Sequence, residues 1–200
     1  MRATTSETWR IVHDERLRLV DDLAHMRDEA WQTPSLCPGW TVHDVLAHLV
    51  DSATTTRIGF VRRMIAAGFD FDCDNARGVE RNRSADPADT LDAMRRAASL
   101  TCTPPAALAT RLVEAFVHGE DIRRPLGIAQ RYPQQAVVDA LTYQLKTSVT
   151  MGGGRQRADG VRLIATDVDF THGSGAEVRG RAIDLLLAVS GRAVLPNIPS

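Results

Sequence analysis

The spacing of apolar residues predicts long helices along most of the chain. Within residues 5–30, Ile11, Leu19 and Leu23 mark an apolar stripe, and charged residues fill the other faces. Similar patterns predict further helices over residues 41–60, 86–101, 104–127 and 132–151. Long helices joined by connections of mixed length are typical of an antiparallel four-helix bundle. The first three quarters of the chain therefore predict a mainly α fold.

The helix expected at residues 41–60 has a clear start. Thr41 can cap the main-chain amide of Asp44, and the negative charge of Asp44 favours the positive end of the helix dipole. The preceding residues, 31–40 (WQTPSLCPGW), are a predicted loop because they hold two prolines and a glycine. Cys37 lies in this loop, and we expect it to be a packing residue because nothing basic adjoins it.

Residues 66–86 have the least regular pattern of the helical part. Asp70, Asp72 and Asp74 alternate as in a calcium loop, but the glycine and the closing glutamate of such a loop are missing. We therefore expect either a loop that lies over the functional site, whose candidate residues are named below, or a mobile connection. Its arginines could meet an anionic substrate, although solvent exposure explains them equally well.

The pattern changes after residues 152–157 (GGGRQR), which we interpret as a break and a linker. Short apolar runs predict strands at residues 161–166 and 168–170, and residues 177–190 predict a helix. Since such a β-β-α piece is too small to fold alone, we expect it to dock on the bundle. The predicted domains are thus a helical bundle at residues 1–151 and a short C-terminal α+β subdomain at residues 158–200.

The composition argues against nucleic-acid and membrane partners. The 200 residues carry 24 basic and 25 acidic side chains, a net charge of −1, so nothing indicates a nucleic-acid partner. The three cysteines form no CxxC pair, which favours a reducing compartment. No apolar run has the length of a signal peptide or membrane span. We expect a cytoplasmic protein that binds neither nucleic acid nor membrane.

Glu114 and His118 are the strongest candidates for chemistry. Four residues apart on one helix, they lie one turn apart on the same face and can bind one metal ion together. Asp121 follows three residues later and can hold the other nitrogen of an imidazole. Glu-x-x-x-His pairs also occur on solvated helix faces. Here the apolar neighbours indicate a largely buried helix, where an unpaired carboxylate would be costly.

His48 is the third candidate ligand. It lies between Val45 and Leu49 on the apolar face of its helix, whereas His43 is expected on an exposed face. Asp44, one turn before His48, can orient the imidazole, although capping explains Asp44 equally well. A lone histidine on an apolar face is more often a core residue than a ligand. The role of His48 therefore depends on its meeting the pair on the later helix.

Two stretches, PSLCPGWTVHDVLAHL and EAFVHGEDIRRPLG, resemble the actinobacterial mycothiol-dependent maleylpyruvate isomerase family. That family belongs to the DinB-like superfamily of metal-binding four-helix bundles. The resemblance implies a divalent metal, commonly zinc, held by His48, Glu114 and His118, and mycothiol as cosubstrate. Two imidazoles and one carboxylate leave an open coordination position, as catalytic zinc requires.

The function implied is a metal-dependent, mycothiol-dependent transferase or isomerase that activates a thiol for attack on a small electrophile. Alternatives are a metal-dependent hydrolase that activates water and a non-enzymatic metal-binding stress protein. The C-terminal part is shorter than the family's, which leaves the isomerase reaction open. Arg179 and Arg181 in that part could contribute positive charge for a carboxylated substrate or the thiol. Either a monomer or a homodimer is compatible with the sequence.

Overall fold

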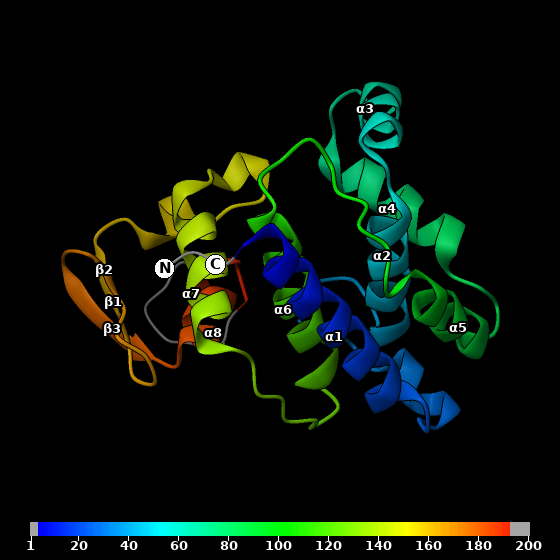
Figure 1. Cartoon of the computed structure of the whole chain (residues 1–200), viewed down its shortest axis with the longest axis horizontal. Helices are drawn as coiled ribbons and strands as arrows, with labels where there is room; N and C mark the ends of the chain where they lie inside the picture. The colour runs from blue at the N-terminus through cyan, green and yellow to red at the C-terminus, as the bar shows by residue number, and fades with distance from the viewer. Residues whose placement is uncertain (1–3, 193–200) are drawn as a thin grey trace. The chain divides into compact units, whose positions relative to one another are not determined.

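The computed structural model of the protein describes residues 4–192, and within them it contains eight α-helices and one three-stranded sheet (Figure 1). The helices are α1 (Thr5–Leu23), α2 (Val42–Thr54), α3 (Arg57–Ala66), α4 (Phe71–Asn82), α5 (Pro87–Ala97), α6 (Ala109–Arg123), α7 (Gln134–Lys146) and α8 (Ala182–Val189). The strands are β1 (Val161–Ala165), β2 (Thr171–Gly173) and β3 (Ala176–Gly180). The prediction of a mainly α fold with a small α+β part at the C-terminal end is confirmed.

The chain divides into two compact units. The helical unit comprises residues 9–108 and 118–130, and the sheet unit comprises the described parts of residues 1–8, 109–117 and 131–200. This division does not coincide with the predicted domains, whose boundary stays a prediction, and the outermost ends of those predicted ranges (1–3 and 193–200) lie outside the described residues. From residue 4 to residue 192, no helix is both long and apolar enough to cross a membrane.

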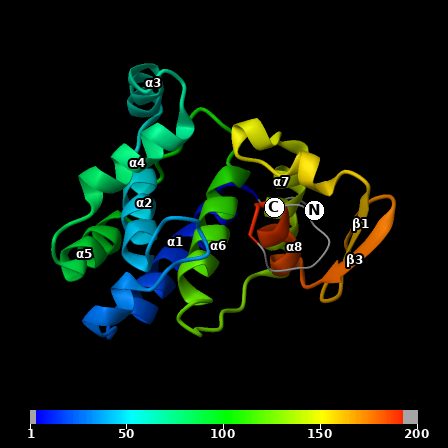
Figure 2. The ribbon, with the colours of Figure 1, turned by 180° about the vertical axis from the view of Figure 1, so that it is seen from behind.

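Helix α2 is the centre of the helical unit and contacts α4 and α5 (Figure 2). Its start is the predicted one, since the Thr41 hydroxyl accepts a hydrogen bond from the Asp44 amide and the Asp44 carboxylate accepts one from the Thr41 amide. Nine of its thirteen residues are buried. The core around it consists of Leu19, Val20, Leu23, Trp31, Val42, Val45, Leu46, Leu49, Val50, Leu91, Met94 and Ile122.

The expectation of a loop at residues 66–86 is wrong, because residues 71–82 form α4. The Asp70 carboxylate caps the helix by accepting a hydrogen bond from the Cys73 amide. Only Asp74, Gly78 and Val79 of α4 are buried, so its sequence shows almost no apolar stripe. Contacts distant in sequence hold it in place.

Asp51 of α2 is the anchor for α3 and α4. Both its carboxylate oxygens accept hydrogen bonds from Arg63 of α3, at 2.9 and 2.7 Å. From α4, Asn82 donates to the same carboxylate at 2.9 Å and Arg81 lies 3.3 Å from it. A Cβ at Gly78 would lie only 2.7 Å from Asp51 Oδ2, so α4 can approach α2 this closely only with glycine there. An open cavity of about 320 Å³ is lined by Asp51, Thr54, Thr55, Thr56, Gly59, Arg63, Arg81 and Asn82.

His43 is buried, with 1% exposure, so the expectation of an exposed side chain is wrong. Its Nε2 lies 2.9 Å from the Thr90 hydroxyl, and its ring packs edge-on against Trp31. Burial lowers the pKa of His43, and the charge of Arg83 lowers it further, against the opposing charges of Asp44 and Asp86. The folded protein therefore keeps this imidazole neutral to a lower pH than the unfolded chain does.

This burial predicts acid-sensitive stability. As the pH falls through about 6.5, the unfolded chain protonates His43 more readily than the folded chain does, so the free energy of unfolding should fall as the pH decreases from 7 to 5. Urea unfolding at a series of pH values measures this slope. The variant His43→Gln, which cannot titrate, should lose part of it. An identical slope in both proteins would mean that other groups cause the acid loss.

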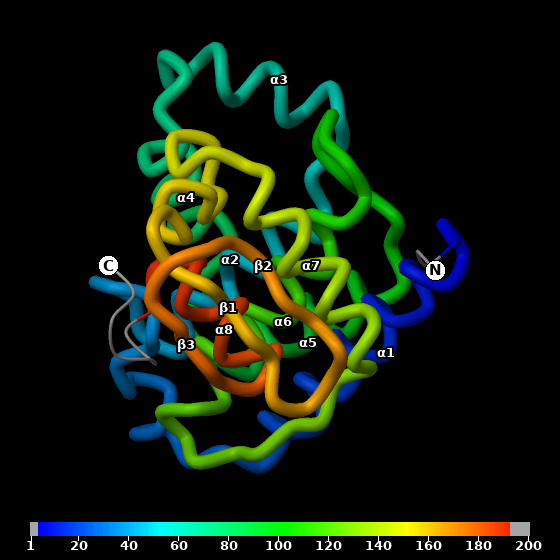
Figure 3. The backbone as a smooth tube through the Cα atoms, turned by 90° about the vertical axis from the view of Figure 1, so that its left-hand side faces the viewer, coloured from blue at the N-terminus to red at the C-terminus, as the bar shows by residue number. Residues whose placement is uncertain are grey.

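The sheet unit has strand order β2-β1-β3, with β1 antiparallel to β2 and parallel to β3 (Figure 3). The strand predicted at residues 161–166 is confirmed as β1. The one expected at 168–170 is wrong, because these residues connect β1 to β2. The helix expected at 177–190 begins only at Ala182, because the preceding residues form β3. Helix α8 packs against the sheet and against α7.

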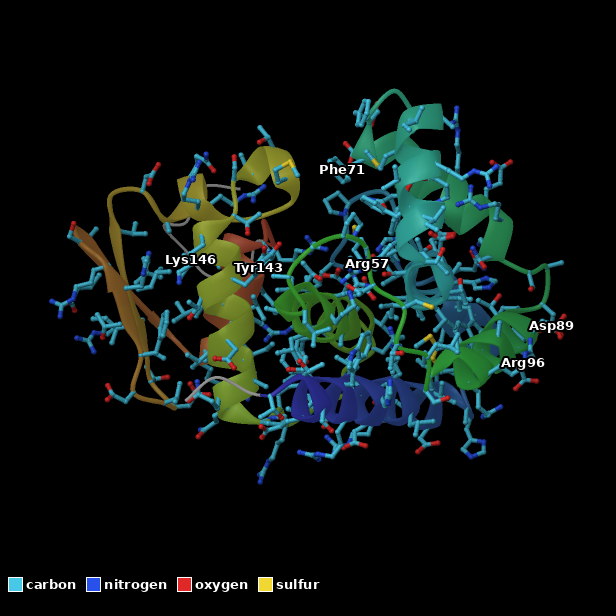
Figure 4. The ribbon with its side chains drawn as sticks, turned by 45° about the horizontal axis from the view of Figure 1, so that its top comes forward. Arg57, Phe71, Asp89, Arg96, Tyr143 and Lys146 are labelled. Atoms are coloured by element: carbon cyan, nitrogen blue, oxygen red, sulfur yellow. The ribbon has the colours of Figure 1, made fainter. Side chains whose placement is uncertain are left out.

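Two of the three glycines in the predicted linker at residues 152–157, Gly153 and Gly154, are packed against the residues that end α7 and α8. A Cβ at Gly153 would lie 2.1 Å from the Thr147 carbonyl oxygen, and one at Gly154 would lie 2.2 Å from that of Val189. Both positions therefore exclude any side chain. The chain's single lysine, Lys146, ends α7 nearby and is exposed (Figure 4).

Candidate metal centre

His48 lies on α2, one turn after Asp44 and between the buried residues Val45 and Leu49. Because Val45 and Leu49 are fixed in the core, the position of the His48 backbone is fixed as well. The indole of Trp40, in the loop before α2, packs on the imidazole with ring centroids 5.1 Å apart. His48 is thus held between a rigid helix and an aromatic ring.

The structure brings His48 and His118 together, although 70 positions separate them in the sequence. Their ring centroids lie 4.7 Å apart at an interplanar angle of 74°. Two imidazoles on one tetrahedral zinc ion, with Zn–N bonds of about 2.0–2.1 Å, have centroids roughly 5 Å apart. The spacing of the two rings therefore fits a shared ion.

Asp121 contacts the imidazole of His118, and its role as the support of a metal ligand stays a prediction. The His118 Nδ1 lies 2.9 Å from Asp121 Oδ2, and the aspartate side chain is fully buried. Because a carboxylate only accepts hydrogen bonds, the neutral tautomer that fits this contact carries its proton on Nδ1 and keeps on Nε2 the lone pair that a metal ion needs. The main-chain oxygen of Asp121 also accepts a hydrogen bond from the Leu36 amide, which ties α6 to the loop before α2.

Glu114 lies one turn before His118 on α6 and forms an ion pair with Arg111. Arg111 Nη2 lies 3.0 Å from Glu114 Oε2, and both side chains are nearly buried, with 6% and 11% exposure. Among the described residues, no three His, Cys, Asp or Glu side chains form a group that could hold a metal ion. The donor types fit zinc, and two of the three are adjacent. The membership of Glu114 in the set stays a prediction.

Asp44 has the capping role that the sequence offered as one of two alternatives. Its carboxylate accepts hydrogen bonds from the amide and the hydroxyl of Thr41, at 2.9 and 2.7 Å, and pairs with Arg83 at 2.8 Å. Burial raises the pKa of Asp44, but the Thr41 hydrogen bonds and the charge of Arg83 outweigh it and lower the pKa below its ordinary value. Its predicted second role, support of His48, stays a prediction.

The two arginines expected to meet a cosubstrate lie in the sheet unit. Arg179 is on β3 with 60% of its side chain exposed, and it donates to Glu177 at 2.8 Å. Arg181 is the N-cap residue of α8, 55% exposed, with Asp167 at 3.9 Å. Both therefore keep one face open to solvent, and their predicted role in cosubstrate binding stays a prediction. Cys37 is partly buried and packs against the core of the helical unit.

Two neighbours of the candidate ligands were not singled out from the sequence. Trp40 packs on His48, and its position beside the predicted loop's Pro-Gly pair was the available signal. Arg111 pairs with Glu114, and the spacing of three residues between them on a helix could have indicated the ion pair.

The comparisons of sequence and of fold with known proteins point to the same family. Residues 12–102 match the sequence model of a family described as "Mycothiol maleylpyruvate isomerase N-terminal domain". The fold matches the crystal structure of a mycothiol-dependent maleylpyruvate isomerase at a TM-score of 0.66 and 14% identity, covering 96% of this chain and 91% of that one. A histidine-to-alanine variant of that isomerase matches with the same TM-score and coverage at 13% identity. No curated protein sequence matches the chain.

Proposed function

We propose, from the match of residues 12–102 to the mycothiol maleylpyruvate isomerase N-terminal domain family, that the protein is a mycothiol-dependent isomerase or transferase. It activates the thiol for attack on a small electrophilic substrate. The reaction depends on a divalent metal, zinc by preference, and takes place in the cytoplasm, where small thiols stay reduced. The observation that carries the proposal is the pairing of His48 with an Asp121-supported His118.

His48, Glu114 and His118 are the proposed metal ligands. Asp121 fixes the tautomer of His118 so that Nε2 is available, and Trp40 restricts rotation of the His48 ring. In the structure the Glu114 carboxylate lies 3.0 Å from Arg111 Nη2. Three protein ligands leave a position for the cosubstrate. When bound, the metal supplies the positive charge that favours a thiolate over a thiol at neutral pH.

The chemistry of the thiolate then determines the outcome. It adds to one carbon of an α,β-unsaturated carbonyl compound, and the electrons of the carbon–carbon double bond move toward the carbonyl oxygen. The remaining single bond can rotate. If the thiolate then leaves, the double bond reforms in the other geometry, and the reaction is an isomerisation. If a proton is taken up at the second carbon instead, the product is a thioether and the reaction is a transfer.

Cobalt substitution tests this proposal. Cobalt in place of zinc should give visible absorption bands of low coordination number, and addition of mycothiol should add a thiolate-to-metal charge-transfer band. Mycothiol disulfide, which has no free thiol, is the matched control and should add none. Cobalt bound without the new band would favour the alternatives, a hydrolase using activated water or a non-enzymatic metal-binding protein. Absence of cobalt binding would refute the metal centre.

A further inference from the structure

The open cavity of about 320 Å³ lies within the helical unit, where α2 ends, α3 begins and α4 ends (Figure 1). Its volume is at the lower end of the range for small-molecule sites. Every side chain on its wall is polar or charged, and the one remaining residue, Gly59, has no side chain. The cavity therefore fits a small and hydrophilic ligand.

Asp51, the one carboxylate on the wall, has no capacity left for a ligand. Its oxygens accept four hydrogen bonds, two from Arg63 and one each from Arg81 and Asn82. Four is about the full number that a carboxylate accepts. The side chain is also only 9% exposed. A cation or a hydrogen-bond donor of a ligand would have to displace these arginines, so the ligand must be recognised by other groups.

Arg81 is the main group on the wall that remains available. Only its Nη2 is engaged, 3.3 Å from Asp51 Oδ1, and 46% of the side chain is exposed. Within the described part of the chain, neither its Nε nor its Nη1 has an acceptor. Arg63 is paired on both sides, with Asp51 and, at 3.3 Å, with Asp74, which does not line the cavity. The wall thus keeps unused hydrogen-bond donors and a positive charge, but no unused carboxylate oxygen.

The start of α3 and three threonines complete the wall. Gly59 lies in the first turn of α3, where the positive end of the helix dipole favours an anion. Thr56 caps this turn by accepting a hydrogen bond from the Gly59 amide at 3.1 Å, so its hydroxyl proton stays available. The hydroxyls of Thr54 and Thr55 donate to main-chain carbonyls of α2, at 2.9 and 2.6 Å, and keep their oxygens as acceptors. The threonines can therefore exchange hydrogen bonds with the hydroxyl groups of a ligand.

From these observations we propose that the cavity binds a small oxyanion that carries hydroxyl groups, either a sugar phosphate or a sugar acid. The oxyanion accepts hydrogen bonds from the free N–H groups of Arg81, and such charge-assisted bonds are about twice as strong as neutral ones. The hydroxyl groups of the ligand meet the threonine hydroxyls and the Asn82 Oδ1, which accepts no hydrogen bond within residues 4–192. This inference does not depend on the proposed enzymatic function.

Isothermal titration calorimetry on the whole chain, without added metal and at constant ionic strength, tests the site. Glucose 6-phosphate or gluconate should bind at one site per chain with a Kd below about 1 mM. Glucose, which lacks the oxyanion, should bind at least ~10-fold more weakly. Tighter binding of glucose 6-phosphate would identify a phosphate ester as the ligand, and tighter binding of gluconate would identify a carboxylate. Absence of binding by both, or equally tight binding of glucose, would overturn the proposal.

Two variants place the binding in the cavity. Arg81→Met removes the free donors and should raise the Kd at least ~10-fold. Gly59→Asp adds a carboxylate to the wall and should abolish binding; its Cβ would meet only Thr56 Oγ1, at 3.1 Å, and an acidic residue suits a first helical turn. The matched control, Arg77→Met, removes an exposed arginine of α4 that does not line the cavity, and it should change the Kd less than about 3-fold. Circular dichroism checks that each variant is folded, and a Kd unchanged in both cavity variants would refute the site.

Discussion

The variant His118→Ala is expected to lose metal binding and thiol-dependent turnover while its fold is retained. The imidazole is one of two that lie together, and it is the one whose available nitrogen is set by Asp121. Loss of a ligand's supporting partner typically costs 10- to 100-fold in metal affinity, so loss of the ligand itself should cost more than about 100-fold. Because 18% of the side chain is exposed, truncation leaves no large cavity.

Cobalt titration and thermal unfolding together measure this effect. The variant Asp121→Asn should bind cobalt roughly 10- to 100-fold more weakly than the wild type, an intermediate result. His25→Ala, which removes an exposed histidine, should behave as the wild type. Undiminished cobalt affinity in His118→Ala would refute the centre, whereas a large loss of thermal stability would mean that the residue is structural.

Arg123→Ala is expected to have the largest effect on stability, a loss of roughly 3–5 kcal/mol in the free energy of unfolding. Its side chain is fully buried; Nε donates to Asp22 at 2.7 Å, and Nη1 lies 3.3 Å from Glu15. Glu15 has only 2% exposure. Truncation would leave Glu15 buried with Arg18 alone, and a buried carboxylate without adequate pairing is strongly destabilising.

The control for this variant removes the other arginine that pairs with Glu15. Arg18→Ala removes a partner that is 50% exposed, so it should cost less than about 1 kcal/mol.

Burial raises the pKa of Glu15, and Arg123 and Arg18 offset this only in part. A raised carboxyl pKa means that the folded state binds a proton more readily than the unfolded state, so stability falls as pH rises. The deficit of Arg123→Ala should therefore shrink when urea unfolding is repeated at pH 5.

Some of the interactions between near neighbours in the sequence were predicted correctly. The cap at Thr41 needs only Asp44, three residues away, and both were identified from the sequence. Helix α4 was missed because its position depends on Asp51, twenty or more residues earlier, and on few apolar contacts of its own. Strand β3 was missed for a similar reason, since its parallel pairing with β1 is a tertiary contact.

The candidate centre follows the same rule. The His118–Asp121 contact is an i, i+3 pair and was predicted from spacing. The approach of His48 required the resemblance to a family in addition to its place on an apolar face. Neither the burial of His43 nor its contact with Thr90 on another helix could be read from periodicity, because the helix carrying it is buried on more than one side.

The solitary Lys146 gives the protein a practical property. All other basic side chains except the histidines are guanidinium groups, so the chain offers one primary amine on a side chain, at the exposed end of α7. An amine-selective fluorophore would attach there and, if the α-amino group is blocked, nowhere else. Such a conjugate would carry its dye in the sheet unit, with both candidate histidine ligands unmodified.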